Sequence, residues 1–207
     1  MNQINSASPK VQIILASGSP RRKMLLESAG IMLKIEVSEA DESHFPREDP
    51  RQYLRRTARA KADAIIKRHS GEHVIIISAD TIVVKDNNIL GKPVNDDDAR
   101  NMLKSLSGRA HHVMTGVCVA DVFHQRTDVF ISETVVHFTK LTDEDIEWYI
   151  QTGEPRDKAG SYGIQGQAAR FVESIEGSYT NVVGLPLCET IRALQKLLSK
   201  TASSQKN

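Results

Sequence analysis

The chain has 207 residues, of which 40% are hydrophobic and 26% are charged, and its formal net charge is +1. This composition is typical of a globular protein with one fair-sized domain or two small ones, and it excludes a strong polyanion-binding field over the whole chain. No apolar run is long enough to span a membrane, and the polar N-terminal stretch has no apolar core of a secretion signal.

The first predicted element is a short buried strand, indicated by the apolar run of residues 11–15, and a helix follows it. Ser19 is well placed as the N-cap of this helix, Pro20 fits its first position and Gly30 fits its end. The apolar face of the helix is expected to carry Met24, Leu25, Leu26 and Ala29.

Arg21 and Arg22 lie in the first turn of this helix, where the helix dipole disfavours cations. An anion bound there would reverse that argument. The hydroxyls of Ser17 and Ser19, the free N–H groups of the turn and the two guanidiniums would suit a phosphate chain. The spacing differs from that of a P-loop. A solvated arginine pair on an ordinary strand–helix turn explains the same residues, and the spacing does not choose between the two interpretations.

The next predicted element is a half-buried strand, because apolar and polar residues alternate over 33–37. An acidic cluster of Glu39, Asp41 and Glu42 follows at the end of this strand. Carboxylates at a strand end can hold a metal ion or can simply be solvated. For any one of the three, solvation is the favoured interpretation.

Residues 51–68 predict a helix with Leu54, Ala58 and Ile65 on one apolar stripe, and Lys61 falls in the same stripe. A lysine on a buried face needs a partner or a cavity wall, although its long side chain can also reach solvent. We favour a site that faces Lys61.

Residues 74–77 predict an apolar strand at the centre of a sheet, and a second apolar run follows at 82–84. Asp80 lies between them, where an unpaired carboxylate is costly to bury, so we expect a function or a specific partner rather than a helix cap. A turn at 86–88 would form a hairpin and bring Lys92 back towards Asp80. Lys92 would then tune the pKa of Asp80, share an anion with it, or form a plain ion pair.

The second half of the chain predicts two helices, a pair of long antiparallel strands, a further short strand and a final helix. These are a helix from Asn95 to Gly108, strands at 111–122 and 129–139, a helix at 143–151 with a Thr142–Asp145 capping box, a strand near 171–175, and a helix after Pro186 with Leu187, Ile191, Leu194 and Leu198 inward. His111 and His112 are adjacent, so they would face opposite sides of a strand, and we interpret them as structural.

A glycine-rich loop covers residues 157–166. In it, Lys158 is placed to reach a phosphate, Tyr162 to stack on a base and Gln165 to read a base edge. A single glycine-rich loop is weak evidence for any of these roles.

The chain shows no internal repeat and no linker-like break, which predicts a single domain over residues 1–207. We expect a core of about 11–198 with loose polar termini at 1–9 and 201–207. Cys118 and Cys188 lie far apart in apolar stretches, which favours neither a zinc cluster nor a disulfide and fits a reducing cytoplasm.

Several stretches, taken together, resemble the Maf family of nucleoside triphosphate pyrophosphatases over roughly residues 11–198. They are ASGSPRR (16–22), SADTIVV (78–84) with GKP (91–93), LSGRAHHVMTGV (106–117), and DKAGSYGIQG (157–166) followed by NVVGLP (181–186). The resemblance implies a single α/β domain with an elongated mixed β-sheet, flanking helices and a cleft between two lobes, similar to inosine triphosphate pyrophosphatases. It also implies hydrolysis of nucleoside triphosphates to monophosphate and pyrophosphate with a divalent metal, Mg²⁺ or Mn²⁺, in a homodimer.

The resemblance assigns roles residue by residue. Asp80 matches the family's catalytic proton acceptor, and Thr81 and Gln165 match the subgroup that prefers dTTP and UTP rather than 7-methyl-GTP. The phosphate-binding loop is matched by Ser17, Arg21 and Arg22, and the charged residues of the cleft by Glu39, Lys61 and Lys92.

On chemical grounds, Asp80 and Glu39 are the candidates for metal coordination and water activation, and Asp80 either accepts the proton itself or only holds the metal. The arginines and lysines would neutralise the phosphates. The amide of Gln165 offers both the donor and the acceptor that a pyrimidine edge requires.

Two other classes of function are open at this stage. One is a nucleotide-binding regulator without turnover, since the family has been linked by name to septum formation, although phosphate binding alone does not need the acidic residues. The other is an RNA-binding module that would use Arg47, Arg51, Arg55, Arg56 and Arg59. The near-zero charge and the absence of interleaved aromatic residues weigh against it. We therefore expect a nucleotide partner and no nucleic-acid or membrane partner.

Overall fold

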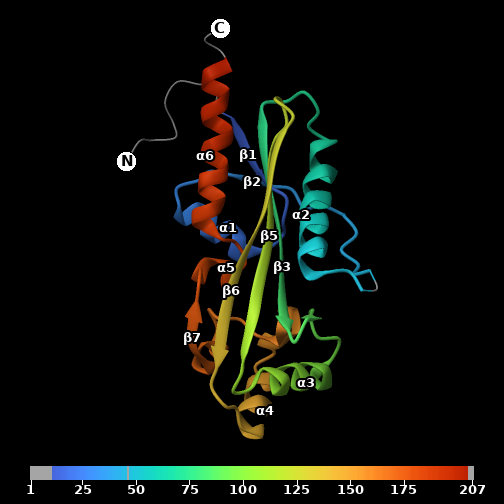
Figure 1. The fold of residues 1–207 in the computed structure, drawn as a ribbon, viewed down its shortest axis with the longest axis vertical. Coiled ribbons are helices and arrows are strands. Elements are labelled where there is room, and N and C mark those ends of the chain that lie inside the picture. The colour runs from blue at the N-terminus through green and yellow to red at the C-terminus, as the bar shows by residue number, and fades with distance from the viewer. Residues whose placement is uncertain (1–10, 46, 205–207) are drawn as a thin grey trace.

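The computed structural model describes residues 11–45 and 47–204. Its centre is three long strands that run along the molecule (Figure 1), β3 (Val74–Lys85), β5 (Ala110–Asp121) and β6 (Arg126–Phe138). They belong to a seven-stranded sheet of order β2-β1-β3-β5-β6-β7, with β4 paired to β3 outside this path. The shorter strands are β1 (Gln12–Leu15), β2 (Lys34–Ile35), β4 (Asn88–Leu90) and β7 (Val172–Glu176). Parallel and antiparallel pairs both occur, which confirms the expected mixed sheet.

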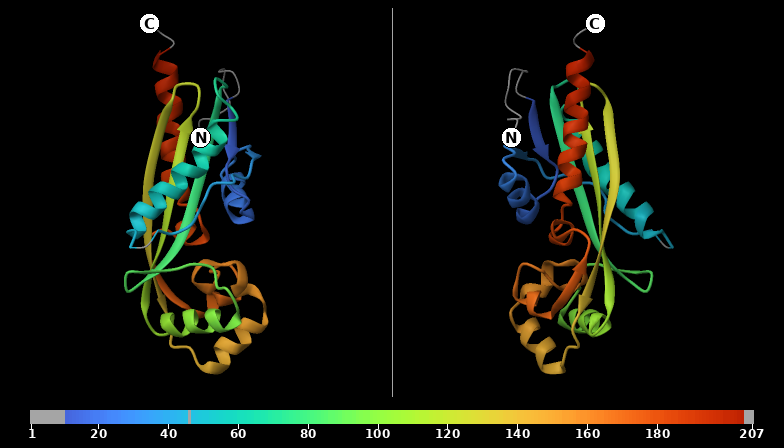
Figure 2. Two further views of the ribbon diagram at one scale, coloured as in Figure 1. Left: turned by 90° about the vertical axis from the view of Figure 1, so that its right-hand side faces the viewer. Right: turned by 60° about the vertical axis from the view of Figure 1, so that its left-hand side comes forward.

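The helices form two groups along the length of this sheet (Figure 2). The first group covers both faces at one end and consists of α1 (Pro20–Ser28), α2 (Pro50–Ile66) and α6 (Leu187–Ser204), with the short α5 (Tyr179–Val183) beside them. The second group lies at the other end and consists of α3 (Asp96–Leu106), α4 (Asp143–Gln151) and three 3₁₀ helices, η1 (Glu154–Asp157), η2 (Ala159–Ser161) and η3 (Gln167–Phe171). The α/β class expected from the sequence is confirmed.

Strand β3 is buried on both faces, and its residues alternate between two cores. Ile76 packs on the side of α2 with Ala62, whereas Ile77 packs on the side of α1 and α6 with Leu26 and Leu194. Successive strand residues point to opposite faces, so Asp80 lies on the α2 side and Thr81 on the α1 side.

Strand pairing leaves part of one edge of β3 uncovered. On this edge β1 pairs with residues 74–77, and β4 pairs with residues 83–85. The segment 78–82 between them has no strand neighbour on that side among the described residues. This gap lies at the carboxyl end of β1, where open sheets with parallel strands commonly bind ligands.

Two predictions about the first fifty residues are wrong. The half-buried strand at 33–37 is reduced to Lys34–Ile35, both exposed, and Val37 is 58% exposed, because β2 is an edge strand with β1 as its partner. Met24 of α1 and Ala29, which follows the last residue of the helix, are exposed. Arg22 takes the inward position of its first turn, and the i+3 and i+4 positions that follow are Leu25 and Leu26.

The C-terminal region also differs from expectation. Helix α5 is absent from the sequence prediction, and residues 201–204 continue α6 rather than forming a loose terminus. No glycine or proline interrupts 187–204, so nothing in that stretch stops the helix. Residues 1–9 and 205–207 of the predicted loose termini lie outside the described residues.

Other local predictions are confirmed. The antiparallel pair of β5 and β6 forms in full, and Thr142 and Asp145 make the reciprocal capping box of α4. The hairpin of β3 and β4 turns at Asp86 and Asn87, which both have positive φ. None of the helices in the described part of the chain combines the length and the apolar character that crossing a bilayer requires.

Candidate active site

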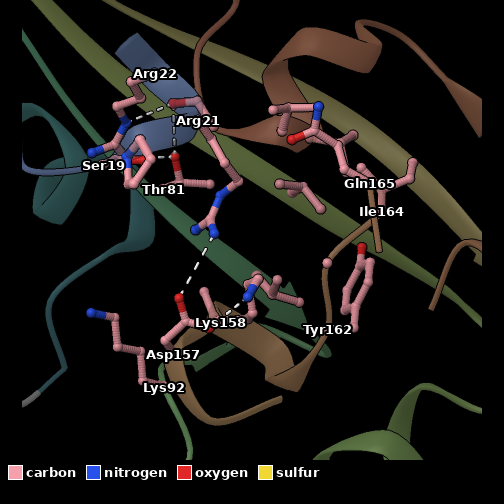
Figure 3. A pocket seen from close by; sticks show the side chains of 18 of the residues that line it. Ser19, Arg21, Arg22, Thr81, Lys92, Asp157, Lys158, Tyr162, Ile164 and Gln165 are labelled. Carbon is pink, nitrogen blue, oxygen red and sulfur yellow. Dashed lines mark hydrogen bonds and ion pairs between the residues drawn. The ribbon is translucent and has the colours of Figure 1, made fainter. Parts of the chain in front are cut away.

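A cavity of about 640 Å³ opens at the uncovered edge of β3, between the two groups of helices. One wall is the turn at 17–22 with the β3 residues Asp80 and Thr81, and the opposite wall is the 3₁₀ region and loop at 154–166. In Figure 3, Arg22 and Thr81 lie on one side and Tyr162, Ile164 and Gln165 on the other. The gap in strand pairing is thus what exposes a central strand to this cavity.

An acid–base cluster of two buried residues, Lys61 and Asp80, and the exposed Glu42 forms one corner of the cavity. The ammonium of Lys61 lies 3.0 Å from Asp80 Oδ1 and 2.8 Å from Glu42 Oε2. The Thr57 hydroxyl lies 3.1 Å from the other Asp80 oxygen, Oδ2. Lys61 is 6% exposed and Asp80 is 8% exposed. The expected site facing Lys61 is therefore present, and both of its partners are carboxylates.

Arg22 organises the same wall of the cavity on the other face of β3, rather than standing free for phosphate. Its Nε donates to the carbonyl of Gly184 at 2.8 Å, while Nη1 donates to Ser17 Oγ and Nη2 to Thr81 Oγ1, each at 3.0 Å. Burial lowers the pKa of Arg22, and the negative charge of Asp80 works against that shift. Arg22 thereby ties the first helix, β3 and the end of α5 together around the cavity.

The more exposed cations of the cavity are Arg21, Lys92 and Lys158. Arg21 extends across the cavity towards Asp157 (Figure 3), with 3.8 Å between Nη1 and Oδ2. Lys158 pairs with Asp157 at 2.5 Å. Lys92 lines the cavity as the hairpin predicts, but no ion pair joins it to Asp80 among the described residues. Arg21, Lys92 and Lys158 suit a bound polyphosphate, which would replace the Asp157 carboxylate as the partner of Arg21 and Lys158.

Glu154 holds the loop that carries Gln165. Its Oε2 accepts from the N–H of Gln167 at 2.9 Å, and its Oε1 accepts from the Tyr149 hydroxyl at 3.0 Å. Gly166 leaves room for this carboxylate, because a Cβ at this position would lie 2.0 Å from Glu154 Oε1 and the Glu154 side chain would have to move. The amide of Gln165 itself has no hydrogen-bond partner among the described residues and lines the cavity.

Tyr162 serves the cavity differently from the stacking role predicted for it. It is 6% exposed, packs edge-on against Phe138 and lies 2.7 Å from His111 through its hydroxyl and the Nε2 of the imidazole. Its ring is thus a fixed wall. His111 is structural, as expected, and His112 pairs with Glu133 on the exposed face.

His111 makes the stability of the protein depend on pH. Burial, with smaller effects from Lys85, His112 and His137, lowers the pKa of His111 to about 3. Between about pH 6.5, the ordinary pKa of histidine, and about pH 3, His111 is protonated in the unfolded chain but neutral in the folded protein. The free energy of unfolding therefore decreases as the pH is lowered through this range, by up to about 1.4 kcal/mol per pH unit. In urea unfolding, the advantage of wild type over His111→Gln should shrink by about 2 kcal/mol from pH 7 to pH 4.5. An unchanged difference would contradict this assignment.

The structure brings all of the predicted site residues except Glu39 to one cavity. Those that line it are Ser17, Arg21, Arg22, Lys61, Asp80, Thr81, Lys92 and Gln165. Both Glu39 and Glu42 are exposed, but only Glu42 lines the cavity. Sequence reasoning gave Thr57 and Glu154 no role. The only sequence signal for Glu42 was its place in the acidic cluster at 39–42. That cluster does not indicate which of its carboxylates reaches the site.

The carboxylates of the cavity suit a metal ion that substrate phosphates also hold. No group of three or more histidine, cysteine or acidic side chains that could hold a metal occurs among residues 11–45 and 47–204. Asp80 and Glu42, joined by Lys61, nevertheless supply two carboxylates. Mg²⁺ is commonly bound through one or two carboxylates with substrate phosphates, so these residues fit such an ion together with a polyphosphate.

Comparisons with known proteins agree with the geometry. The chain is 49% identical over 186 residues to a protein of Geobacillus sp. (strain WCH70) named dTTP/UTP pyrophosphatase, which covers 90% of this chain and 98% of that one. It is also 49% identical over 185 residues to a protein of the same name from Syntrophotalea carbinolica, covering 89% and 84% of the two chains.

Two solved structures align with this chain at low sequence identity. A HAM1 protein from Coxiella burnetii aligns with a TM-score of 0.48 and 12% identity over 90% of this chain and 99% of that one. The Staphylococcus aureus Ham1 protein aligns with a TM-score of 0.42 and 12% identity, over 61% and 71%. The sequence model of the Maf-like protein family matches residues 12–197. With motifs in the expected order around one cavity, the chain belongs to the family of Maf-like proteins.

Proposed function

We propose that this protein hydrolyses dTTP and UTP to the corresponding monophosphate and pyrophosphate. The observation that carries the proposal is the buried Asp80–Lys61 pair, with the exposed Glu42 carboxylate beside Lys61, at one corner of a cavity that Arg21, Lys92 and Lys158 also line. Such a site places carboxylates for water activation next to cations for a leaving polyphosphate. Relatives with the same printed name and 49% identity support the proposal.

In the proposed reaction, a water oxygen forms a bond to the α-phosphorus, and the bond from that phosphorus to the α–β bridging oxygen breaks. The pyrophosphate leaves with the bridging oxygen. Asp80 orients the water and takes its proton, and Lys61 holds the Asp80 carboxylate in place at 3.0 Å. Arg21, Lys92 and Lys158 bind the phosphates and stabilise the charge that develops on the leaving group.

We propose Mg²⁺ or Mn²⁺ as the cofactor, held by Asp80 and Glu42 together with the substrate phosphates. When bound, such an ion would polarise the phosphate oxygens and lower the pKa of a water molecule. Glu42 takes the place that the sequence gave to Glu39, because Glu42 reaches Lys61 at 2.8 Å and lines the cavity.

Glu42 and Glu39 offer a matched test of this site. We expect Glu42→Gln to lower kcat/KM for UTP by about 100-fold, since it removes a charged group beside the reacting atoms. Glu39→Gln, the same change on a neighbour that does not line the cavity, should stay within about twofold of wild type. Steady-state pyrophosphate release measures both. Equal losses in the two variants, or none in either, would contradict the placement of Glu42.

The experiment for the function itself is pyrophosphate release from dTTP, UTP, CTP, dATP, GTP and 7-methyl-GTP with Mg²⁺ or Mn²⁺. We expect dTTP and UTP to react fastest, because the carboxamide of Gln165 can donate to a carbonyl of the uracil or thymine base, where cytosine carries an amino group. Preference for 7-methyl-GTP would keep the reaction but overturn the base selectivity. Binding without release from any nucleotide would favour a regulator linked to septum formation.

We propose a single domain over 1–207 that acts as a homodimer in the cytoplasm and has no nucleic-acid partner. The family resemblance supports the dimer, and the unpaired thiols of Cys118 and Cys188 fit a reducing compartment. A formal net charge of +1 weighs against a nucleic-acid surface.

A further inference from the structure

We propose that the main-chain N–H and C=O of Thr81 read the imide edge of the uracil or thymine base. This edge carries the N3–H donor beside a carbonyl acceptor. The inference rests on the proposed function for the identity of the substrate. It adds a base-recognition contact made by the main chain of β3 rather than by a side chain.

The direction of the peptide groups follows from β1. The N–H of Ala16 donates to the carbonyl of Ile77 at 2.8 Å, so the peptide groups of Ile77 face the β1 side of the sheet. In a strand, the N–H and C=O of one residue point to the same side, and the side alternates along the chain. The peptide groups of Ala79 and Thr81 therefore face the same side as those of Ile77.

Two independent contacts agree with this direction. The β3–β4 hairpin closes around Asp86 and Asn87, which makes Lys85 and Asn88 its hydrogen-bonded closing pair on the same side. In addition, the Lys61 ammonium lies 3.5 Å from the carbonyl of Ala79. Residues 77, 79, 81, 83 and 85 thus direct their main-chain groups to one edge.

At Thr81 this edge is open. The backbone hydrogen bonds of the described residues include none from the N–H or to the C=O of Thr81 on this side, because β1 ends before it and β4 begins beyond it. Thr81 lines the cavity. An uncovered strand edge offers a donor and an acceptor side by side, which suits a ligand with the complementary pair.

The side chain of Thr81, by contrast, is already occupied. Its hydroxyl accepts from Arg22 Nη2 at 3.0 Å and lies 3.0 Å from the Thr115 hydroxyl and 3.3 Å from the Gly184 carbonyl. One hydroxyl hydrogen and its lone pairs are used by these contacts. Gln165 lies on the other side of the cavity (Figure 3), so a base between the two walls would meet the backbone on one side and the amide on the other.

The first test measures binding, so that it stands whether or not UTP is hydrolysed. The probes are α,β-methylene-UTP and the same compound methylated at N3, titrated by calorimetry into wild type and Gln165→Ala. We expect N3 methylation to weaken binding to wild type by about 100-fold, since it leaves a polar main-chain group unpaired. The ratio of the two dissociation constants, with and without the N3 methyl group, should be the same in Gln165→Ala. Equal binding of both probes, no binding of either, or a ratio that falls to about one in Gln165→Ala would overturn the proposal.

The second test assigns the contact to residue 81. Thr81→Pro removes the main-chain N–H, and Thr81→Val is the matched control that removes only the hydroxyl. Proline is tolerated where a strand N–H faces no partner. Thr81→Pro should bind α,β-methylene-UTP about tenfold more weakly than Thr81→Val. Equal affinities would overturn the assignment. If the proline variant does not fold, the effect of N3 methylation on binding to wild type and to Gln165→Ala decides whether the proposal holds. Failure of wild type to release pyrophosphate, with these ratios intact, would overturn the proposed function alone.

Discussion

Replacing Asp80 by asparagine should lower the rate of pyrophosphate release from UTP by about 1000-fold or more while the fold persists. Asparagine keeps the shape of the side chain but can neither accept the proton nor balance the ammonium of Lys61, 3.0 Å away. Lys61 is not left as an isolated buried charge, because Glu42 stays within 2.8 Å of it. The expected result is therefore an inactive protein whose melting temperature lies within a few degrees of wild type.

The matched control for Asp80→Asn is Asp63→Asn. Asp63 lies on α2, like Lys61, but pairs with Arg59 on the exposed surface. This change should leave kcat and KM within about twofold of wild type. Single-turnover assays with both variants, beside thermal unfolding, separate chemistry from stability. Near-normal turnover by Asp80→Asn would remove Asp80 from the reaction.

Replacing Gly116 by alanine should destabilise the protein and lower its activity together. Gly116 is the β5 partner of Asp80, and α2 crosses the sheet against it, so that an added Cβ would lie 2.6 Å from the carbonyl oxygen of Leu54. The backbone of α2 would have to move away from the sheet to make room for this Cβ. Overpacking of this kind costs about 1–3 kcal/mol, or a few degrees in Tm for a chain of this size.

Activity should fall because α2 carries Thr57 and Lys61, which position Asp80. A displacement of about 1 Å can cost about 100-fold in rate. Gly91→Ala is the control for stability, since nothing lies within 4 Å of a Cβ there. Denaturant unfolding and UTP kinetics measure the two effects. Wild-type stability in Gly116→Ala would contradict the close packing of α2 on the sheet.

Much of this architecture can be predicted from the amino-acid pattern. The apolar stripe of residues 51–68 placed Lys61 on the buried face of α2, where the structure has it. The cost of burying an unpaired carboxylate in an apolar strand singled out Asp80, and Lys61 is the partner that this argument required. The two long strands expected at 111–122 and 129–139 correspond to β5 and β6, because the existence of a long element is easier to predict than its ends.

The parts that could not be predicted depend on where elements end and on distant contacts. Glu39 and Glu42 are equivalent by composition, and the path of the chain after β2 alone decides which one reaches Lys61. Arg22 looks like a phosphate ligand next to Arg21. Its inward position is fixed by the carbonyl of Gly184, 162 residues away in sequence. The open edge at Thr81 likewise follows from the ends of two partner strands, which short sequence windows do not define.

The most direct test of the account is to hydrolyse UTP in ¹⁸O-labelled water and to locate the label by mass spectrometry. Attack at the α-phosphorus, with Asp80 beside the water, predicts one ¹⁸O in the uridine monophosphate and none in the pyrophosphate. Label in the pyrophosphate, or release of orthophosphate as the first product, would place the attack on another phosphorus and contradict the proposed arrangement of the cavity.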